Sequence, residues 1–270
     1  VAFQDSQGMD AADITHALNS PINKDDTPSE YLFEEIEEEK AGLFSKTMLA
    51  EKGHVSQNDI TALVDLFEHA KTYGSLIQVP EKLAKVLPEI EQRLNDVLKH
   101  GDLTHAASHV LEPLLQQAQL LTRQYDAVVA NPPYMGSKYY SPTLKIFVNK
   151  EYKKAKADLY SCFMERNKQA SKSNGFHAMI NIPNWMFLSS FEDLRKGLFD
   201  TQTIDSFVHN GRGVFGSDFG SCAFVIRKTH LPVFRGSYRR LFEKQGSVAS
   251  NEELEARFHK ANTYTPSNSD

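Results

Sequence analysis

The sequence predicts an α/β fold, in which a doubly wound sheet carries a mainly helical insert. Two observations predict this fold class. Within residues 30–120, apolar residues recur at helical spacing. From residue 121 onward, short runs of β-forming residues alternate with helical patterns. With 270 residues, 40% of them hydrophobic, the chain can bury the core of one or two domains.

The first elements are expected to be short. We assign residues 1–29 to a strand stub and a linker, with the stub over Val1–Gln4 and a short helix over Asp10–Asn19. Residues 20–29 hold two prolines and are expected to form a loop. Residues 32–51 are helical in pattern, with an acidic, solvated face.

Three more helices are expected in the insert. Ser56-Gln-Asn-Asp59 is a capping box, which predicts that a helix begins there and runs toward Gly74. Pro80 starts a second helix and Gly101 stops it, since proline suits the first turn and glycine the end. Residues 102–124 form a third helix, which Pro113 interrupts.

The centre of the chain is Tyr125-Asp-Ala-Val-Val-Ala-Asn-Pro-Pro-Tyr134. Ala127–Ala130 is an apolar run of β-formers and is expected to be a fully buried strand of the parallel kind. Paired prolines follow. Because each lacks an N–H and has a fixed φ, neither β-ladder pairing nor a helix can continue through them. The sequence therefore predicts a rigid loop at the carboxyl end of a strand, where open α/β sheets bind ligands.

This loop carries candidate catalytic residues, namely Asn131, Pro132, Pro133 and Tyr134. The amide oxygen of Asn131 and the carbonyl of Pro132 can accept the two N–H bonds of an exocyclic amino group, which frees the lone pair on its nitrogen. Tyr134 can stack on the base that carries this amino group. A base within a duplex must first be flipped out to reach such a loop. The alternative is a proline-rich turn beside an aromatic residue.

The later elements are expected in alternation, with an antiparallel pair of strands at the end. They are a polar loop over 139–157, a helix over 158–169 capped by Asp158, a turn over 171–175, a strand over 176–182, a helix over 191–198, strands over 203–209 and 222–227, and a frayed tail from residue 261.

Charge is distributed unevenly along the chain. Residues 1–120 hold nine Lys and Arg against 21 Asp and Glu, a net charge of −12, whereas residues 121–270 hold 21 against 14, a net charge of +7. A basic half that contains the proline loop suits a polyanionic partner. The candidate DNA-binding residues are Lys145, Lys153, Lys154, Arg239 and Arg240. A solvated lysine-rich face is the alternative for either cluster.

The proline motif resembles that of amino-methyltransferases that use S-adenosylmethionine, above all the adenine-N6 DNA enzymes. More narrowly, Lys40–Leu49, Tyr73–Gln78, Asn131–Gly136 and Trp185–Ser190 are similar to the large adenine methyltransferases of BREX phage-defence systems. The resemblance covers most of the chain. It implies a Rossmann-like methyltransferase sheet whose catalytic core spans residues 121–230, with the start of a downstream region, partly disordered, at 231–270.

The resemblance also implies site residues. Phe215 matches an aromatic that stacks on the flipped base, with an ordinary loop anchor as the alternative, and Asp158 is the candidate cofactor-binding residue. The glycine-rich loop and the acidic residue that hold the cofactor in such enzymes have no counterpart between Val1 and Tyr125. We therefore expect an internal fragment of a longer enzyme, without the first cofactor-binding strands of the sheet.

Two further motifs are weak. Gly211-Arg-Gly213-Val-Phe-Gly216 matches a dinucleotide fingerprint, but a strand rather than a helix is predicted to follow it. His105 and His109 lie one helical turn apart without a third ligand, so we predict no metal site. Cys162 and Cys222 are too few and too far apart for a disulfide framework.

We therefore expect methyl transfer from S-adenosylmethionine to N6 of adenine in DNA, within phage defence or restriction-modification. The expected partners are DNA and other defence-system proteins, and the expected location is the cytoplasm, since no apolar run approaches the ~20 residues of a membrane span. Two alternatives stay open: methylation of a glutamine side chain on a protein, and a non-catalytic fragment for DNA binding or assembly.

Overall fold

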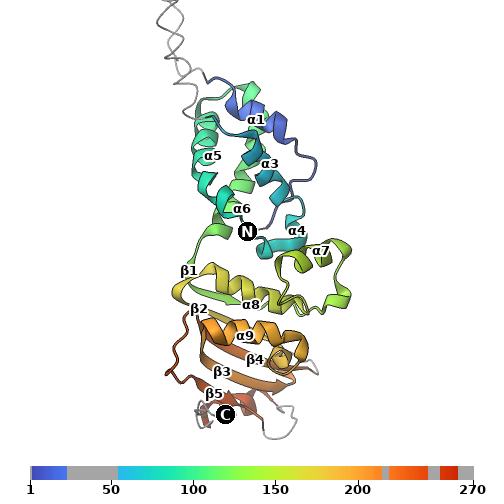
Figure 1. The fold of residues 1–270 in the computed structure, drawn as a ribbon, viewed down its shortest axis with the longest axis vertical. Helices are drawn as coiled ribbons and strands as arrows, with labels where there is room; N and C mark the ends of the chain where they lie inside the picture. The colour runs from blue at the N-terminus through green and yellow to red at the C-terminus, as the bar shows by residue number, and fades with distance from the viewer. Residues whose placement is uncertain (1, 23–53, 215–218, 243–249, 261–270) are drawn as a thin grey trace, which may run out of the picture. The chain divides into compact units, whose positions relative to one another are not determined.

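A computed structural model describes residues 2–22, 54–214, 219–242 and 250–260 of this chain. The chain divides into two compact units, Val1–Thr122 and Arg123–Asp270, which are drawn in Figure 1. The first unit is helical in its described part, and the second contains a five-stranded mixed sheet. The predicted α/β class is confirmed.

The helical unit has one apolar core. Its elements are α1 (Ala11–Asn19), α3 (Gln57–Leu66), α4 (Ala70–Tyr73), the 3-10 turns η1 (Gly74–Leu76) and η2 (Leu103–Val110), α5 (Glu81–His100) and α6 (Leu111–Thr122). The Asp10 carboxylate accepts from the backbone N–H groups of Ala12 and Asp13, so it caps α1. Ser56 caps α3 in the same way through the N–H of Asn58. Gly101 ends α5, as predicted.

Three expectations for this unit are wrong. No strand forms at residues 2–10, where Ser6 N–H donates to the Phe67 carbonyl instead. The core contains Ile14 and Leu18 of α1 beside α3 and α5, so the helical part does not begin at residue 30. Pro113 lies in the first turn of α6 rather than interrupting a helix, because the N–H that proline lacks has no helical partner there. Residues 23–53 lie outside the described residues.

The sheet of the second unit has the order β1-β2-β4-β3-β5. β1 is parallel to β2, β4 is antiparallel to both β2 and β3, and β5 is parallel to β3. The strands are β1 (Tyr125–Ala130), β2 (Ser171–Asn181), β3 (Thr203–Arg212), β4 (Gly220–Arg227) and β5 (Ser237–Arg240). The predicted antiparallel pair of β3 and β4 is confirmed.

Helices cover one face of this sheet. The other elements are η3 (Ser137–Tyr139), α7 (Pro142–Glu151), α8 (Leu159–Ala170), η4 (Pro183–Met186), η5 (Ser189–Phe191), α9 (Glu192–Thr201) and α10 (Asn251–Lys260). Figure 1 shows α8 and α9 on the same side of the strands. Alternate residues of β2 and β4 are buried, which is the period-two pattern of a sheet with one covered face. Cys162 and Cys222 are free and buried.

β1 is not the buried strand that its apolar sequence predicts. Among the described strands it lies at the edge of the sheet, with β2 as its one neighbour, and Val129 is 79% exposed. A strand of this composition is typical of a position with a neighbour on each side and a helix on each face. The sequence was therefore correct about the strand and wrong about its burial within this chain.

Three other differences concern the sequence between the strands and after them. The expected polar loop over 139–157 contains α7, which Ser141 caps and Pro142 begins. The expected turn at 171–175 belongs to β2, but it is a bulge, since the partners in β2 jump from Ser171 to Phe176 while those in β1 advance by two residues. β5 joins the same sheet, so a separate region does not begin at residue 231. The tail from 261 lies outside the described residues.

Candidate active site

The topology brings the proline loop, the end of β2 and the start of β4 to one edge of the sheet. Ala130 and Asn181 end the parallel strands β1 and β2, so the residues after them emerge on the same side. β4 runs the other way, and its Cys222 lies opposite Asn181. The sequence predicts a ligand-binding loop at this position, and Asn131 directly follows β1 there.

Tyr134 folds back over the loop. Its hydroxyl oxygen lies 3.1 Å from the carbonyl oxygen of Ile180 and 3.2 Å from Oδ1 of Asn131, and it can donate to either. Burial raises the pKa of Tyr134, with a smaller effect from Cys222, so the phenol stays protonated and remains a donor at neutral pH. The phenol therefore ties the amide of Asn131 to the end of β2.

Asn131 keeps hydrogen-bonding capacity for a ligand. It is exposed, and Oδ1 has a second lone pair beyond the one that faces Tyr134. Among the described residues, no hydrogen bond uses the carbonyl of Pro132, although Pro132 itself is buried. Pro133 is exposed beside it. The loop thus offers two oxygen acceptors, as a substrate NH₂ group requires.

Aromatic rings surround Tyr134. The ring of Tyr160 on α8 is edge-on at 6.2 Å between centroids, and the ring of Phe219 is edge-on at 6.0 Å. The predicted stacking residue Phe215 lies outside the described residues. Phe219 follows it by four residues in the sequence and was not singled out from the sequence. The signal available was an aromatic between the glycine-rich segment and the next strand.

Asp158 holds the loop in place. Its Oδ1 accepts from the backbone N–H of Met135 (3.0 Å) and from that of Tyr160 (3.3 Å), so one carboxylate joins the loop to the start of α8. The N–H of Leu159 donates to the Met135 carbonyl (2.9 Å), which closes the contact. Burial raises the pKa of Asp158, and the backbone hydrogen bonds oppose this rise. The predicted cap of α8 is confirmed, while cofactor binding by Asp158 stays a prediction.

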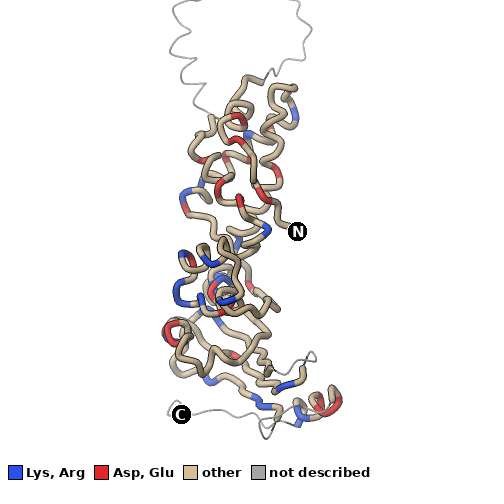
Figure 2. The backbone as a smooth tube through the Cα atoms, turned by 90° about the vertical axis from the view of Figure 1, so that its right-hand side faces the viewer, with Lys and Arg blue, Asp and Glu red and all other residues tan. Residues whose placement is uncertain are grey.

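The predicted DNA-binding residues lie in two different settings. Lys145 is exposed in the first turn of α7, and Lys153 and Lys154 are exposed just after its last residue. Arg239 instead lies 4.5 Å from the ring of Phe258 and donates to its carbonyl, and Arg240 lies 5.4 Å from the ring of Phe242. Figure 2 shows how Lys and Arg are distributed along the second unit. The three lysines are therefore more accessible to a ligand than the two arginines, which contact aromatic rings of this chain.

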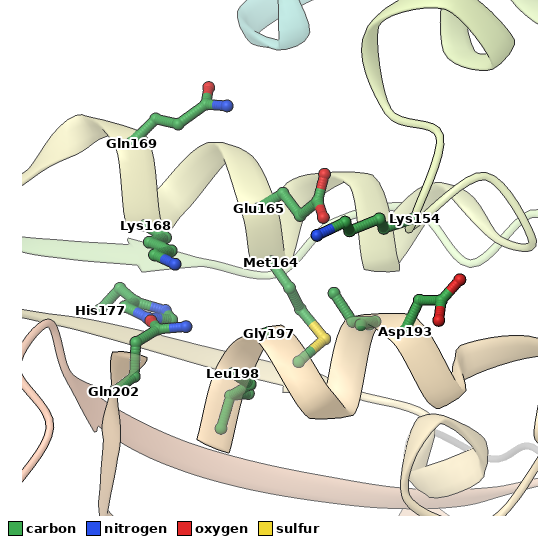
Figure 3. A pocket seen from close by; sticks show the side chains of 11 residues that line it. Lys154, Met164, Glu165, Lys168, Gln169, His177, Asp193, Gly197, Leu198 and Gln202 are labelled. Atoms are coloured by element: carbon green, nitrogen blue, oxygen red, sulfur yellow. The ribbon is translucent and has the colours of Figure 1, made fainter. Parts of the chain in front are cut away.

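A cavity of about 260 Å³ lies between α8 and α9, away from the proline motif (Figure 3). His177 of β2 lines it, and Nε2 of this buried residue lies 2.6 Å from Oε1 of Gln202. Burial lowers the pKa of His177 to about 4, so the ring is neutral. No motif residue lines this cavity. No motif in the sequence indicates this cavity.

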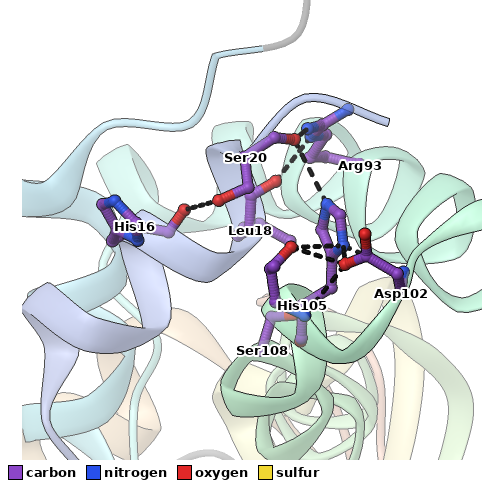
Figure 4. Close-up of polar contacts among 8 residues, drawn as sticks. His16, Leu18, Ser20, Arg93, Asp102, His105 and Ser108 are labelled. Carbon is purple, nitrogen blue, oxygen red and sulfur yellow. Dashed lines mark hydrogen bonds and ion pairs between the residues drawn. The ribbon is translucent and has the colours of Figure 1, made fainter. Parts of the chain in front are cut away.

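Among the described residues, no group of three or more His, Cys, Asp or Glu could hold a metal ion. His105 is buried, and its Nδ1 lies 3.1 Å from the Asp102 carboxylate. Its Nε2 lies 3.2 Å from the Ser20 carbonyl, which also accepts from Arg93. Figure 4 shows this cluster, which joins η2 to the end of α1.

The structure describes residues 211–214 of the glycine-rich segment and the strand that comes after it. Gly211 and Gly213 have positive φ values of 83° and 89°, which favour glycine. Gly220 begins β4, so a strand follows the segment where a phosphate-binding motif would need a helix.

Comparison with known proteins identifies the family. Residues 26–215 match the family of Eco57I restriction-modification methylases, and this chain belongs to that family. It is similar to the adenine-specific methyltransferase BrxX of Escherichia coli O9:H4 strain HS, with 39% identity over 202 residues, which are 73% of this chain and 17% of BrxX. It is also similar to the adenine-specific methyltransferase PglX of Lacticaseibacillus casei strain Zhang, with 33% identity over 197 residues, 70% of this chain and 16% of PglX.

The chain thus spans about a sixth of the length of these relatives. Among solved structures, the DrdV–DNA complex matches 58% of this chain and 19% of that chain, with 17% identity and a TM-score of 0.43. No helix in the described part of the chain is both long and apolar enough to cross a membrane.

The family implies S-adenosylmethionine as cofactor, and the described residues do not supply a complete pocket for it. The second unit begins its sheet with β1, and the described residues that precede β1 are helical or irregular rather than a strand with a glycine loop. Asp158, the predicted ligand, has Oδ1 occupied by two backbone N–H groups.

Proposed function

We propose that this chain forms the substrate-amino-group site of a DNA methyltransferase that modifies N6 of adenine in phage defence of the BREX type. The observation that carries the proposal is the loop at Asn131–Tyr134. It follows a strand end, offers two oxygen acceptors and is flanked by the rings of Tyr134 and Phe219. The likeness to BrxX and PglX supports the choice of adenine.

The residues of this chain would act on the amino group of the base. Adenine N6 is a weak nucleophile because its lone pair is delocalised into the ring. Hydrogen bonds from its two N–H groups to Oδ1 of Asn131 and the carbonyl of Pro132 would favour a pyramidal nitrogen with an available lone pair. S-adenosylmethionine supplies an activated methyl group, so positioning and electrostatics are the protein's main contribution.

Tyr134 and Phe219 would hold the flipped base. A base stacked on an aromatic ring gains about 1–3 kcal/mol, which offsets part of the cost of leaving the duplex. The hydroxyl of Tyr134 meanwhile fixes the amide of Asn131. The same loop could also accept the amide of a protein glutamine, but the basic second unit favours a polyanionic substrate.

Methyl transfer to DNA by the full-length protein tests this function. We expect Asn131→Ala to lower the rate by about two to three orders of magnitude, by analogy with the loss of one oxyanion-hole donor. Asn251→Ala is the matched control, since Asn251 is an exposed asparagine at the start of α10. An unchanged rate in Asn131→Ala, or label in protein glutamine rather than adenine, contradicts the proposal.

A further inference from the structure

Four lysines line a cavity of about 400 Å³ beside α7. They are Lys145, Lys153, Lys154 and Lys156, and the same cavity is lined by the polar side chains of Ser137, Asn149, Ser190 and Asp193. None of the four lysines has an ion pair among the described residues, unlike Lys150, which lies 3.3 Å from Glu151. Lys154 also lines the cavity between α8 and α9, where its ammonium group points toward Glu165 (Figure 3). The lining of the lysine cavity itself has four lysines and one acidic residue, Asp193, so this cavity attracts anions.

The turn that carries three of these lysines is firmly held. Tyr152 and Ala155 alternate with the lysines and are fully buried. The N–H of Ala155 donates to the Tyr152 carbonyl (2.9 Å), and the Ala155 carbonyl accepts from the hydroxyl of Ser161 and, at 3.4 Å, from the thiol of Cys162. The backbone beneath the lysines is therefore pre-organised, and binding an anion would order only their side chains.

The same turn is joined to the proline loop. Gly136 and Asp158 form an antiparallel bridge, and the N–H of Ser137 donates to the Ala157 carbonyl (3.0 Å). Ser137 lines the cavity and follows Tyr134 by three residues, which an extended chain spans in about 11 Å at most. The lysine cavity and the candidate active site are thus neighbouring parts of one structure.

We propose that the lysine cavity binds a backbone phosphate of the DNA strand that carries the target base. Lysine binds phosphate as a flexible point charge, and the hydroxyl groups of Ser137 and Ser190 add neutral donors. A phosphate held there would set the position of the flipped nucleotide relative to Asn131. The choice of DNA as the source of the phosphate rests on the proposed function, whereas the anion site itself rests on the cavity.

The test compares two variants of this chain with the same loss of charge. The triple variant Lys153→Gln, Lys154→Gln, Lys156→Gln removes three cavity lysines. The control Lys82→Gln, Lys85→Gln, Lys99→Gln removes three exposed lysines from α5. Binding of a fluorescent single-stranded oligonucleotide is measured over a series of salt concentrations, after thermal melting has confirmed that both variants fold.

We expect the cavity variant to bind about tenfold more weakly at low salt. The slope of log K against log salt should fall by about 0.7 for each phosphate contact that is lost on a single strand. The α5 control should bind as the original chain does. Equal oligonucleotide binding by the two variants overturns the proposal. If inorganic phosphate or pyrophosphate binds the cavity but the cavity variant binds the oligonucleotide as the original chain does, the cavity is an anion site that does not bind DNA, and the proposal is also overturned.

Methylation by the full-length protein separates this proposal from the proposed function. If the cavity binds DNA phosphate, the cavity variant should raise the KM for DNA and leave kcat nearly unchanged. Loss of oligonucleotide binding without any adenine methylation by the original protein would refute the function and support the phosphate site. Full methylation with an unchanged KM in the variant would refute the phosphate site and leave the function standing.

Discussion

Asp158 gives the sharpest test of how the proline loop is held. Asp158→Ala removes the acceptor for two backbone N–H groups, those of Met135 and Tyr160. A net hydrogen bond to a charged group contributes about 1.5–3 kcal/mol, and loss of a helix N-cap alone costs about 0.5–2 kcal/mol. Because burial of the carboxylate opposes these gains, we expect Asp158→Ala to lower the free energy of unfolding by about 2–3 kcal/mol. Asp158→Asn keeps an oxygen acceptor and should cost about 1 kcal/mol or less.

The assay can be confined to the unit that contains Asp158. Trp185 is the one tryptophan of the sequence, it belongs to the second unit, and it is buried. Its fluorescence during urea unfolding therefore reports on that unit. Asp10→Ala removes the cap of α1 in the first unit, and it should leave the Trp185 transition unchanged. Equal destabilisation by Ala and Asn at position 158 would refute the role of the oxygen acceptor.

The contribution of Asp158 to the free energy of unfolding should depend on pH with a definite sign. Burial raises the pKa of Asp158 above its usual value of about 3.9, so the folded state binds a proton more tightly than the unfolded state does. The stability that this group contributes is fully present below the unfolded pKa and declines as pH rises through the folded pKa. The original chain should therefore lose stability relative to Asp158→Asn as the pH is raised from about 4. The opposite trend would show that the charge stabilises the fold.

Three other outcomes are expected. Tyr134→Phe loses one hydroxyl donor and should reduce methylation only modestly, whereas Tyr134→Ala also loses the contacts with Tyr160 and Phe219 and should reduce it far more; equal losses would assign the effect to the hydroxyl. Gly197→Ala should raise the free energy of unfolding by about 1 kcal/mol, because Gly197 is inside α9 and an added Cβ meets no atom within 4 Å. Urea unfolding followed by Trp185 fluorescence measures this change, and a lower free energy of unfolding would show that the added methyl group clashes with its surroundings. Calorimetric titration of this chain with S-adenosylmethionine should show weak binding, and a low-micromolar dissociation constant would mean that the pocket is complete.

Local signals predicted much of the fold. Asp10, Ser56 and Asp158 were expected to begin helices, and each side chain accepts a backbone N–H as a cap does. Gly101 was expected to end a helix and does so. These predictions depend on contacts within a few residues, so the sequence contains all that they need.

The errors come from contacts that the local sequence does not show. The composition of β1 reflects neighbours that this sheet does not provide, so its exposure could not be predicted from its residues. α7 was overlooked because its lysines suggested a loop, although Ser141 and Pro142 form a helix start. The pairing of Met135 with Asp158 joins positions 23 residues apart, and no pattern in the sequence announces it.

The edge position of β1 has a further consequence for the loop that follows it. Within the described residues the loop is anchored along one side, by β2 through Tyr134 and by Asp158 at its far end. A segment fixed at two points can still rotate about the line that joins them, and ordering it on substrate binding costs entropy. A strand that paired with the free edge of β1 would remove that rotation in advance. Pairing at the edge of β1 would then raise the affinity for the base, and binding of the base would raise the affinity of that pairing by the same factor. Hydrogen exchange at the amides of β1 would slow when the base is bound.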